Sequence, residues 1–490
     1  MLSRLTSRIQ SFGRAAAVRE SAYYAIGLIA TRAVSLLMLP VNTHFLSVSE
    51  YGRLEVLLAL ADVGAVVFGL ALPTTLSRFV GTAETWEKRR EVCAHIFAVA
   101  ILTSAVLAAA GFAAAGEIAK LLPGNPNVTE VRILVVTLSM EGLLGVGLTW
   151  LRIRGAAATF FTLSMVRAVL FASLSATLLV SGFGLAGVLG AGAIATVVQG
   201  VAVAVIVLRE TGVRVRGIDW WPLTLFSGPL LVSALAMFAL GSLDRWFLAD
   251  AVGTAELGVY GVAVRIGIMT AVLLQPFHMW WFPKRFIVLY EPHGVARSAH
   301  VVGLGLVIIM AAAVAVSLGG PLVIQLLTPA AYHPAIYLIP WIALIYAVQE
   351  VASLLELGSF LRRDGFVPLA TNAFGAAVVL VLYWLLIPPY GVSGAIAATL
   401  IAQLARTVVI HLVSQYYVRL PYDFGRLSLV AAVAAATTAA SFALLPGFWV
   451  FLGGLVALPA TVAVAYGLRL LSPYRPPPGE AGPVLARPPA

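Results

Sequence analysis

Residues 184–208 read GLAGVLGAGAIATVVQGVAVAVIVL and contain no charged residue. A helix needs about 20 predominantly apolar residues to cross the hydrocarbon core of a bilayer, so this stretch is long enough to span a membrane. It also lacks the strict alternation of apolar and polar residues that a strand of a membrane barrel requires. The stretch therefore predicts a transmembrane α-helix.

Similar apolar stretches recur along the whole chain of 490 residues, which is 61% hydrophobic and only 11% charged. The mean hydropathy is +0.99. Because soluble domains are about 25% charged, this composition argues against a water-soluble globule and favours an all-α polytopic membrane protein. We predict fourteen transmembrane spans, at 21–46, 53–80, 91–116, 129–151, 158–181, 184–208, 221–248, 257–283, 297–327, 333–361, 366–388, 391–416, 426–446 and 448–471.

Loops rich in Lys and Arg alternate with loops that have few or none. The basic run at 88–90, for example, contrasts with the uncharged turns at 181–184 and 388–391. Because basic residues collect on cytoplasmic loops, the alternation places both termini in the cytoplasm and requires an even number of spans. The net charge of +10 is explained by these loops, so we expect no nucleic-acid partner.

The two ends of the chain differ from the spans. In residues 1–20, apolar residues fall at helical spacing and Arg4 and Arg8 lie one turn apart, which predicts a cytoplasmic helix at the membrane surface. Residues 472–490 are rich in proline and predict a disordered cytoplasmic tail.

The start of the 184–208 stretch has a counterpart in the second half of the chain. The tetrapeptide GLAG (184–187) resembles GVSG (391–394), and SEYG (49–52) resembles AELG (255–258), at nearly the same separation. This spacing predicts a duplicated unit of six helices. Because six is even, the copies enter the membrane from the same side, and two such lobes can enclose a cavity and alternate its access. We read the matched glycines as tight turns and close helix packing.

The predicted organisation follows from the spans and the repeat. It comprises an N-terminal lobe at 21–208, a cytoplasmic linker at 209–220, a C-terminal lobe at 221–416 and two extra helices at 426–471.

Several arginines fall inside or near the ends of the predicted spans, where a charge costs at least about 2.5–3.5 kcal/mol. Arg32 and Arg265 lie deepest, and we expect them to line a hydrated cavity. For Arg53 and Arg78 the competing interpretation is snorkelling to the interface. For Arg167 and Arg406 it is pairing with carboxylates. A guanidinium binds phosphate through two parallel hydrogen bonds, so a cavity lined by these residues predicts an anionic substrate. The candidate substrate-binding residues are Arg32, Arg265, Arg53, Arg78, Arg167 and Arg406.

Four intramembrane acids are candidates for ion coupling or for charge balance: Asp62, Glu141, Glu350 and Asp244. The pattern leaves both roles open. The histidines show no metal-ligand spacing, so we expect neither a metal nor a cofactor. Coupling to a Na⁺ gradient, a H⁺ gradient or the membrane potential is left open.

A resemblance to a known family rests on Arg32, the SEYG turn (49–52), the segment from Gly69-Leu70 to Ser77-Arg78-Phe79, and the turns at 184–187 and 390–394. These residues resemble the polysaccharide flippases, the O-antigen and exopolysaccharide exporters of the multidrug/oligosaccharidyl-lipid/polysaccharide superfamily. The resemblance covers about residues 20–420 and implies two six-helix lobes.

The resemblance also implies a function. The substrate would be an oligosaccharide joined by diphosphate to a polyisoprenyl lipid, moved from the inner to the outer leaflet of the bacterial inner (plasma) membrane for exopolysaccharide or lipopolysaccharide synthesis. Arg32, Arg53 and Arg265 resemble the arginines that hold the anionic head group. Membrane lipids and the polymerase and glycosyltransferases of the same pathway are the implied partners.

Three other functions compete. A multidrug antiporter of the same superfamily needs intramembrane carboxylates, but here arginines outnumber midplane acids. A peptidoglycan lipid-precursor flippase also fits fourteen spans. A membrane polysaccharide polymerase or ligase would need a large outer loop or an acidic metal motif, and the sequence has no Asp-x-Asp. We therefore expect a transporter rather than an enzyme.

Overall fold

The structure is a computed structural model that describes residues 36–215, 220–361, 366–472 and 474. Every regular element in these residues is an α-helix or a short 3₁₀-helix, which confirms the predicted all-α fold class. The predicted surface helix at 1–20, Arg32 and most of the first predicted span lie outside the described residues, as does most of the predicted tail. Residues 36–45, at the end of the first predicted span, are helical.

Twelve helical segments among the described residues are long and apolar enough to cross a membrane. One of them, α16 (Phe366–Tyr417), has 52 residues and contains a non-helical backbone at Gly391, so it holds two of the predicted spans. The protein is thus a multi-pass membrane protein. Because the first predicted span lies mostly outside the described residues, the total of fourteen and the sidedness of the termini stay predictions.

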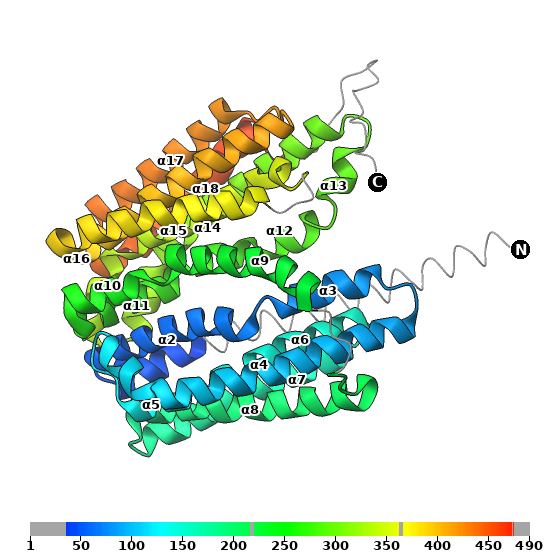
Figure 1. Cartoon of the computed structure of the whole chain (residues 1–490). Helices are drawn as coiled ribbons and strands as arrows, with labels where there is room; N and C mark the ends of the chain where they lie inside the picture. Colours follow the sequence, from blue (N-terminus) through cyan, green and yellow to red (C-terminus); the bar gives the residue numbers. More distant parts are fainter. Residues whose placement is uncertain (1–35, 216–219, 362–365, 473, 475–490) are drawn as a thin grey trace, which may run out of the picture. The chain divides into compact units, whose positions relative to one another are not determined.

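The chain divides into two compact units, Met1–Phe238 and Ala239–Ala490. The helices of the first unit (Figure 1) are α2 (Val48–Gly69), α3 (Leu72–Thr82), α4 (Trp86–Leu121), α5 (Val128–Ser139), α6 (Glu141–Ile153), α7 (Ala157–Val180), α8 (Gly184–Thr211) and α9 (Trp220–Gly241), whose last residues cross the unit boundary. Buried side chains of α3, α4 and α6, among them Leu76, Phe97 and Trp150, form a continuous core. The predicted lobe and linker boundaries stay predictions.

Capping boxes begin two helices of the first unit. The hydroxyl of Ser47 accepts from the backbone N–H of Glu50, and the carboxylate of Glu50 accepts from the N–H of Ser47. Asn127 and Glu130 repeat this exchange at the start of α5. These bonds satisfy N–H groups that have no partner within the helix. The SEYG motif therefore marks the start of α2.

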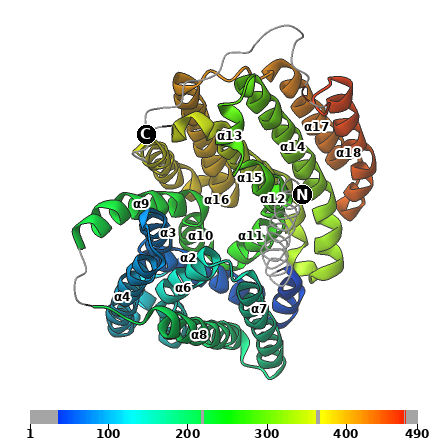
Figure 2. The same ribbon diagram turned by 90° about the vertical axis from the view of Figure 1, so that its right-hand side faces the viewer.

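In the second unit, α14 is the central packing partner. Figure 2 shows α17 and α18, the two predicted extra helices, lying against α14, and buried residues of α12, α15 and α17 complete the core around it. The elements are α10 (Asp244–Ala251), α11 (Gly253–Gly267), α12 (Met269–Trp281), α13 (Arg285–Leu289), α14 (Gly294–Leu327), η1 (Ala330–Tyr337), α15 (Ile339–Leu355), η2 (Glu356–Phe360), α16, α17 (Phe424–Leu444), η3 (Gly447–Trp449) and α18 (Val450–Gly467).

The matched glycines occupy equivalent turns. Gly184 begins α8 with a φ of 54°, and Gly391 interrupts α16 with a φ of 55°. This left-handed backbone conformation is readily adopted only by glycine. The same rare conformation at both matched positions supports the predicted duplication and the interpretation of these glycines as turn residues.

Candidate functional site

The first unit contains a cavity of about 460 Å³ between α3 and α6. This volume lies within the range of roughly 300–1,000 Å³ that small-molecule sites occupy. Each of the two helices contributes hydroxyl groups or a guanidinium and one apolar side chain to the lining. The lining residues are Pro73, Thr74, Ser77, Thr149, Arg152 and Ile153.

A break in the second predicted span shapes this cavity. The predicted span 53–80 is not one continuous helix, because α2 ends at Gly69 and α3 begins at Leu72. Leu70 and Ala71 between them have φ values of 46° and 54°, a conformation that costs free energy for residues other than glycine. Pro73 then lies in the first turn of α3, where its missing N–H removes no helical bond. Discontinuous transmembrane helices commonly form the substrate sites of transporters.

The charge at the cavity comes from Arg152. Its Nη2 donates to Oγ1 of Thr149 at 3.0 Å, and its guanidinium carbon lies 5.9 Å from the centre of the Phe160 ring. Arg152 forms no ion pair with any described residue, whereas three other arginines of this unit do. These pairs are Arg53–Glu130, Arg154–Glu210 and Arg214–Glu91. The cavity therefore has a positive charge that no described carboxylate neutralises.

The predicted residues of the first unit take other positions. Nη2 of Arg53 lies 3.4 Å from Oε1 of Glu130, which is buried. Arg78 is exposed and its guanidinium carbon lies 4.4 Å from the centre of the Phe226 ring. Asp62 is exposed on α2. None of these residues is among those that line the 460 Å³ cavity, and their roles in binding or coupling stay predictions.

Arg167 and Glu141 lie in neighbouring helices of the first unit. Nη1 of Arg167 on α7 is 3.5 Å from Oε1 of Gln199 on α8. Arg167 also acts electrostatically on Glu141, the first residue of α6. This arrangement supports the interpretation of Glu141 as a structural counter-charge for an arginine.

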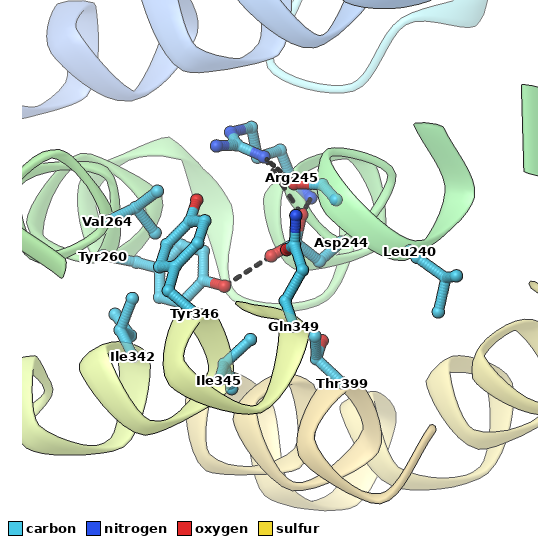
Figure 3. Close-up of a pocket in the computed structure, with 11 residues that line it drawn as sticks. Leu240, Asp244, Arg245, Tyr260, Val264, Ile342, Ile345, Tyr346, Gln349 and Thr399 are labelled. Atoms are coloured by element: carbon cyan, nitrogen blue, oxygen red, sulfur yellow. Dashed lines mark hydrogen bonds and ion pairs between the residues drawn. The ribbon is translucent and has the colours of Figure 1, made fainter. Parts of the chain in front are cut away.

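Asp244 and Arg245 form a buried pair at the start of α10, with residue exposures of 4% and 8%. Nη1 of Arg245 lies 3.3 Å from Oδ1 of Asp244 and donates to the carbonyl of Gly241 at 3.0 Å. The hydroxyl of Tyr260 donates to the other carboxylate oxygen (Figure 3). The adjoining cavity of about 20 Å³ has room for about one water molecule. The geometry supports charge balance as the role of Asp244.

Arg406 and Arg265 also belong to the second unit. Arg406 is 7% exposed, and it donates from Nε to Asn372 at 3.0 Å and from Nη1 to Gln403 at 3.3 Å. Glu356 acts electrostatically on Arg406, although the ion pair of Glu356 is with Arg285. Arg265 is half-buried in the last turn of α11.

Glu350, the last of the predicted acids, is 8% exposed on α15. Its Oε2 lies 3.4 Å from Nε2 of His278 on α12. The structure therefore gives Glu350 a histidine neighbour, and its role in ion coupling or charge balance stays a prediction. Among the described residues, no group of three or more His, Cys, Asp or Glu side chains could hold a metal ion.

Arg152 lies one residue beyond the predicted span 129–151 and was not among the candidate site residues. It follows Thr149 by three residues, and together these polar side chains end an otherwise apolar span. That pattern was visible, but a basic residue at a span end is also the usual sign of a cytoplasmic loop. Only the packing of α3 against α6 shows that Arg152 lines a cavity and is not simply part of a loop.

The comparisons with solved structures show the fold. The lipid II flippase MurJ, in an inward closed conformation, has a TM-score of 0.67 and 11% identity over 91% of this chain and 99% of that chain. A MOP-superfamily transporter from Pyrococcus furiosus has a TM-score of 0.55 and 18% identity over 82% and 95% of the two chains. An inward-facing multidrug resistance MATE transporter of the same superfamily has a TM-score of 0.55 and 16% identity over 82% and 98%. The chain thus has the fold of MOP-superfamily transporters.

The sequence comparisons give the family. No curated protein matches the chain. The model of the polysaccharide biosynthesis protein family matches residues 17–285, which is more than half of the 490 residues. The chain therefore belongs to the polysaccharide biosynthesis protein family.

Proposed function

We propose that this protein is a flippase that moves an oligosaccharide, linked through a diphosphate to a polyisoprenyl lipid, from the inner to the outer leaflet of the bacterial inner membrane. The observation that carries the proposal is Arg152 at the 460 Å³ cavity of the first unit, which forms no ion pair with any residue that the structure describes. The family supports a role in polysaccharide synthesis, and the structural neighbour named as a lipid II flippase supports the same class of transport.

The chemistry of the cavity suits a diphosphate. Arg152 uses one N–H for Thr149, which leaves donors of its fork for phosphate oxygens. Thr74 and Ser77 add hydroxyl groups on the opposite wall, which can bond to phosphate or sugar. The lipid tail would stay in the bilayer while the head group enters the protein, so the tail would keep its apolar surroundings. Alternating access between two lobes then carries the head group across.

A multidrug antiporter is the alternative that the fold allows, because MATE transporters share it. Its usual cargo is an organic cation, which Arg152 would repel. The cavity charge therefore favours an anionic substrate. A peptidoglycan precursor has the same lipid-diphosphate chemistry, so transport assays must compare several head groups.

We expect Arg152→Ala to weaken binding of undecaprenyl diphosphate by about tenfold or more. A hydrogen bond to a charged group contributes about 1.5–3 kcal/mol, and 1.4 kcal/mol corresponds to tenfold. Binding would be measured by titrating the lipid into full-length protein in nanodiscs. Arg152→Lys keeps the charge but not the fork and should be intermediate.

Arg152 is itself exposed, so the matched control is Arg90→Ala, which removes the same charge from an exposed position at the start of α4 that does not line the cavity. It should bind like the wild type. Translocation of a lipid-diphosphate oligosaccharide in reconstituted vesicles completes the experiment. Undiminished binding and transport by Arg152→Ala would remove the basis of the proposal. Exchange of organic cations by the wild type, without lipid transport, would favour the antiporter.

A further inference from the structure

His278 and Glu350 face each other inside the second unit. Nε2 of His278 and Oε2 of Glu350 are 3.4 Å apart, and the side chains are 11% and 10% exposed. Nε2 of His278 is buried and has no hydrogen-bond partner among the described residues. The imidazole ring stacks on Phe282, with 4.3 Å between centroids, which fixes its plane. Two groups that bind protons thus meet where little water reaches them.

The charged neighbours of this pair come from adjacent elements. Arg285 on α13 acts on His278, and Glu356 on η2 acts on Glu350. These two neighbours form their own ion pair, with Nη1 of Arg285 3.6 Å from Oε1 of Glu356. Arg406 on α16 also acts on Glu356. The result is a network of two acids, two arginines and one histidine, in which His278, Glu350 and Arg406 are buried and Arg285 and Glu356 are partly buried.

The other helices packed on α12 and α15 carry their charges elsewhere or nearer their ends. On α14, Arg297 is paired with Glu291 and His300 bonds to the carbonyl of Ser472. On α11, Glu256 lies in the first turn and Arg265 in the last. η1 contributes His333.

Each protonation state of Glu350 has a compensating feature. Without the proton, the carboxylates of Glu350 and Glu356 balance the guanidinium groups of Arg285 and Arg406, and the network is neutral with a neutral His278. With the proton, the network carries one net positive charge, but the His278–Glu350 pair is itself neutral and the acid O–H can donate to Nε2 of His278. Burying an unpaired charge costs several kcal/mol, and because each state gains one contribution and loses another, the site can exchange its proton.

The partner of the carboxylate points to a proton rather than a metal cation. Na⁺, like other hard cations, prefers several oxygen ligands, whereas an imidazole nitrogen is a poor ligand for it. Imidazole is, however, a good partner for a proton near neutral pH. A carboxylate with a single nitrogen neighbour therefore suits H⁺.

We propose that His278 and Glu350 form a site that binds and releases one proton, and that this proton couples the transporter to the proton gradient. Glu350 takes the proton from water on one side of the membrane and forms an O–H bond. The acid then donates a hydrogen bond to His278, and the proton leaves to water on the other side after the cavity reorients. The coupling rests on the proposed function, whereas proton binding does not.

The proton site is tested by infrared difference spectroscopy on the full-length protein in lipid vesicles, titrated in H₂O and D₂O. The wild type should show a protonated-carboxyl band that titrates and shifts in D₂O. Glu350→Gln should lose that band. Glu291→Gln, which changes an exposed carboxylate of the same unit, should keep it. A titrating band that persists in Glu350→Gln would overturn the assignment.

His278→Leu provides a second variant that leaves the carboxyl in place. Loss of the imidazole acceptor should move the midpoint of the band by about one pH unit or more. An unchanged midpoint would show that His278 takes no part. This variant keeps the site testable if Glu350→Gln does not fold.

Coupling is tested separately, in vesicles that transport a lipid-diphosphate oligosaccharide with and without a pH gradient. A gradient of one pH unit should raise the final ratio of lipid between the two leaflets about tenfold in the wild type, since one pH unit supplies about 1.36 kcal/mol per proton, and should leave that ratio unchanged in Glu350→Gln. Equal transport with and without the gradient would overturn the coupling. A titrating band in a wild type that moves no lipid would refute the proposed function and leave the proton site standing.

Discussion

Replacing Asp244 with alanine is expected to lower the free energy of unfolding by about 3–5 kcal/mol, because it removes the carboxylate that faces a buried guanidinium. Arg245 is only 8% exposed, and its bond to the carbonyl of Gly241 supplies no negative charge. Tyr260, which is also buried, would lose the acceptor of its hydroxyl. Denaturant unfolding of the purified protein in detergent micelles measures the loss.

Two variants separate the buried pair from a general effect of lost charge. Asp250→Ala removes an exposed acid from the same helix and should change the free energy of unfolding by less than about 0.5 kcal/mol. The double variant Asp244→Asn with Arg245→Gln removes both charges and should recover much of the stability. A loss from Asp244→Ala no larger than that from Asp250→Ala would show that the pair contributes nothing to stability.

Gly394→Ala is expected to lower the free energy of unfolding by about 3 kcal/mol, at the upper end of the range for overpacking. An added Cβ would lie 2.6 Å from the carbonyl carbon of Leu386 and closer still to its oxygen. Both are backbone atoms of the helix that precedes the turn at Gly391, so they cannot rotate away as a side chain could. Unfolding in the same detergent measures the effect.

Gly187→Ala is the matched comparison, because Gly187 occupies the equivalent position of the repeat. There the added Cβ would lie 3.0 Å from the Cβ atoms of Leu178 and Phe183, a contact that small shifts can relieve. We expect a loss of about 1 kcal/mol. Equal losses in the two variants would mean that the two turns are packed alike, contrary to the structure.

Local sequence determined the class of this protein. The length and continuity of the apolar stretches, such as 184–208, are properties of neighbouring residues, and they were enough to predict transmembrane helices. The turn role of the glycines at 184 and 391 could be predicted for the same reason, since a tight turn depends on the few residues that form it. The resemblance to the polysaccharide flippases also rested on such local motifs, and the family match confirms it.

The break that shapes the cavity is flanked by Gly69 and Pro73, but the two residues that turn the chain carry no such local sign. Leu70 and Ala71 are neither glycine nor proline, so nothing in their types indicates a positive φ. Residues of this kind adopt that conformation only when the surrounding packing requires it. The predicted span 53–80 therefore runs as one helix through residues 70–71, which separate α2 from α3 in the structure.

The partners of the charged residues were decided only by the tertiary structure. Arg53 meets Glu130 and Glu350 meets His278, across helices that are far apart in sequence. The sequence around an arginine inside an apolar span is the same whether a carboxylate, an aromatic ring or an empty cavity lies beside the arginine. The sequence shows which charges are costly in a membrane. The helix packing determines which of these charges are neutralised, and it leaves Arg152 without a described carboxylate and available to an anion. The reason is that Coulomb attraction and hydrogen bonds act over distances in space and not along the chain.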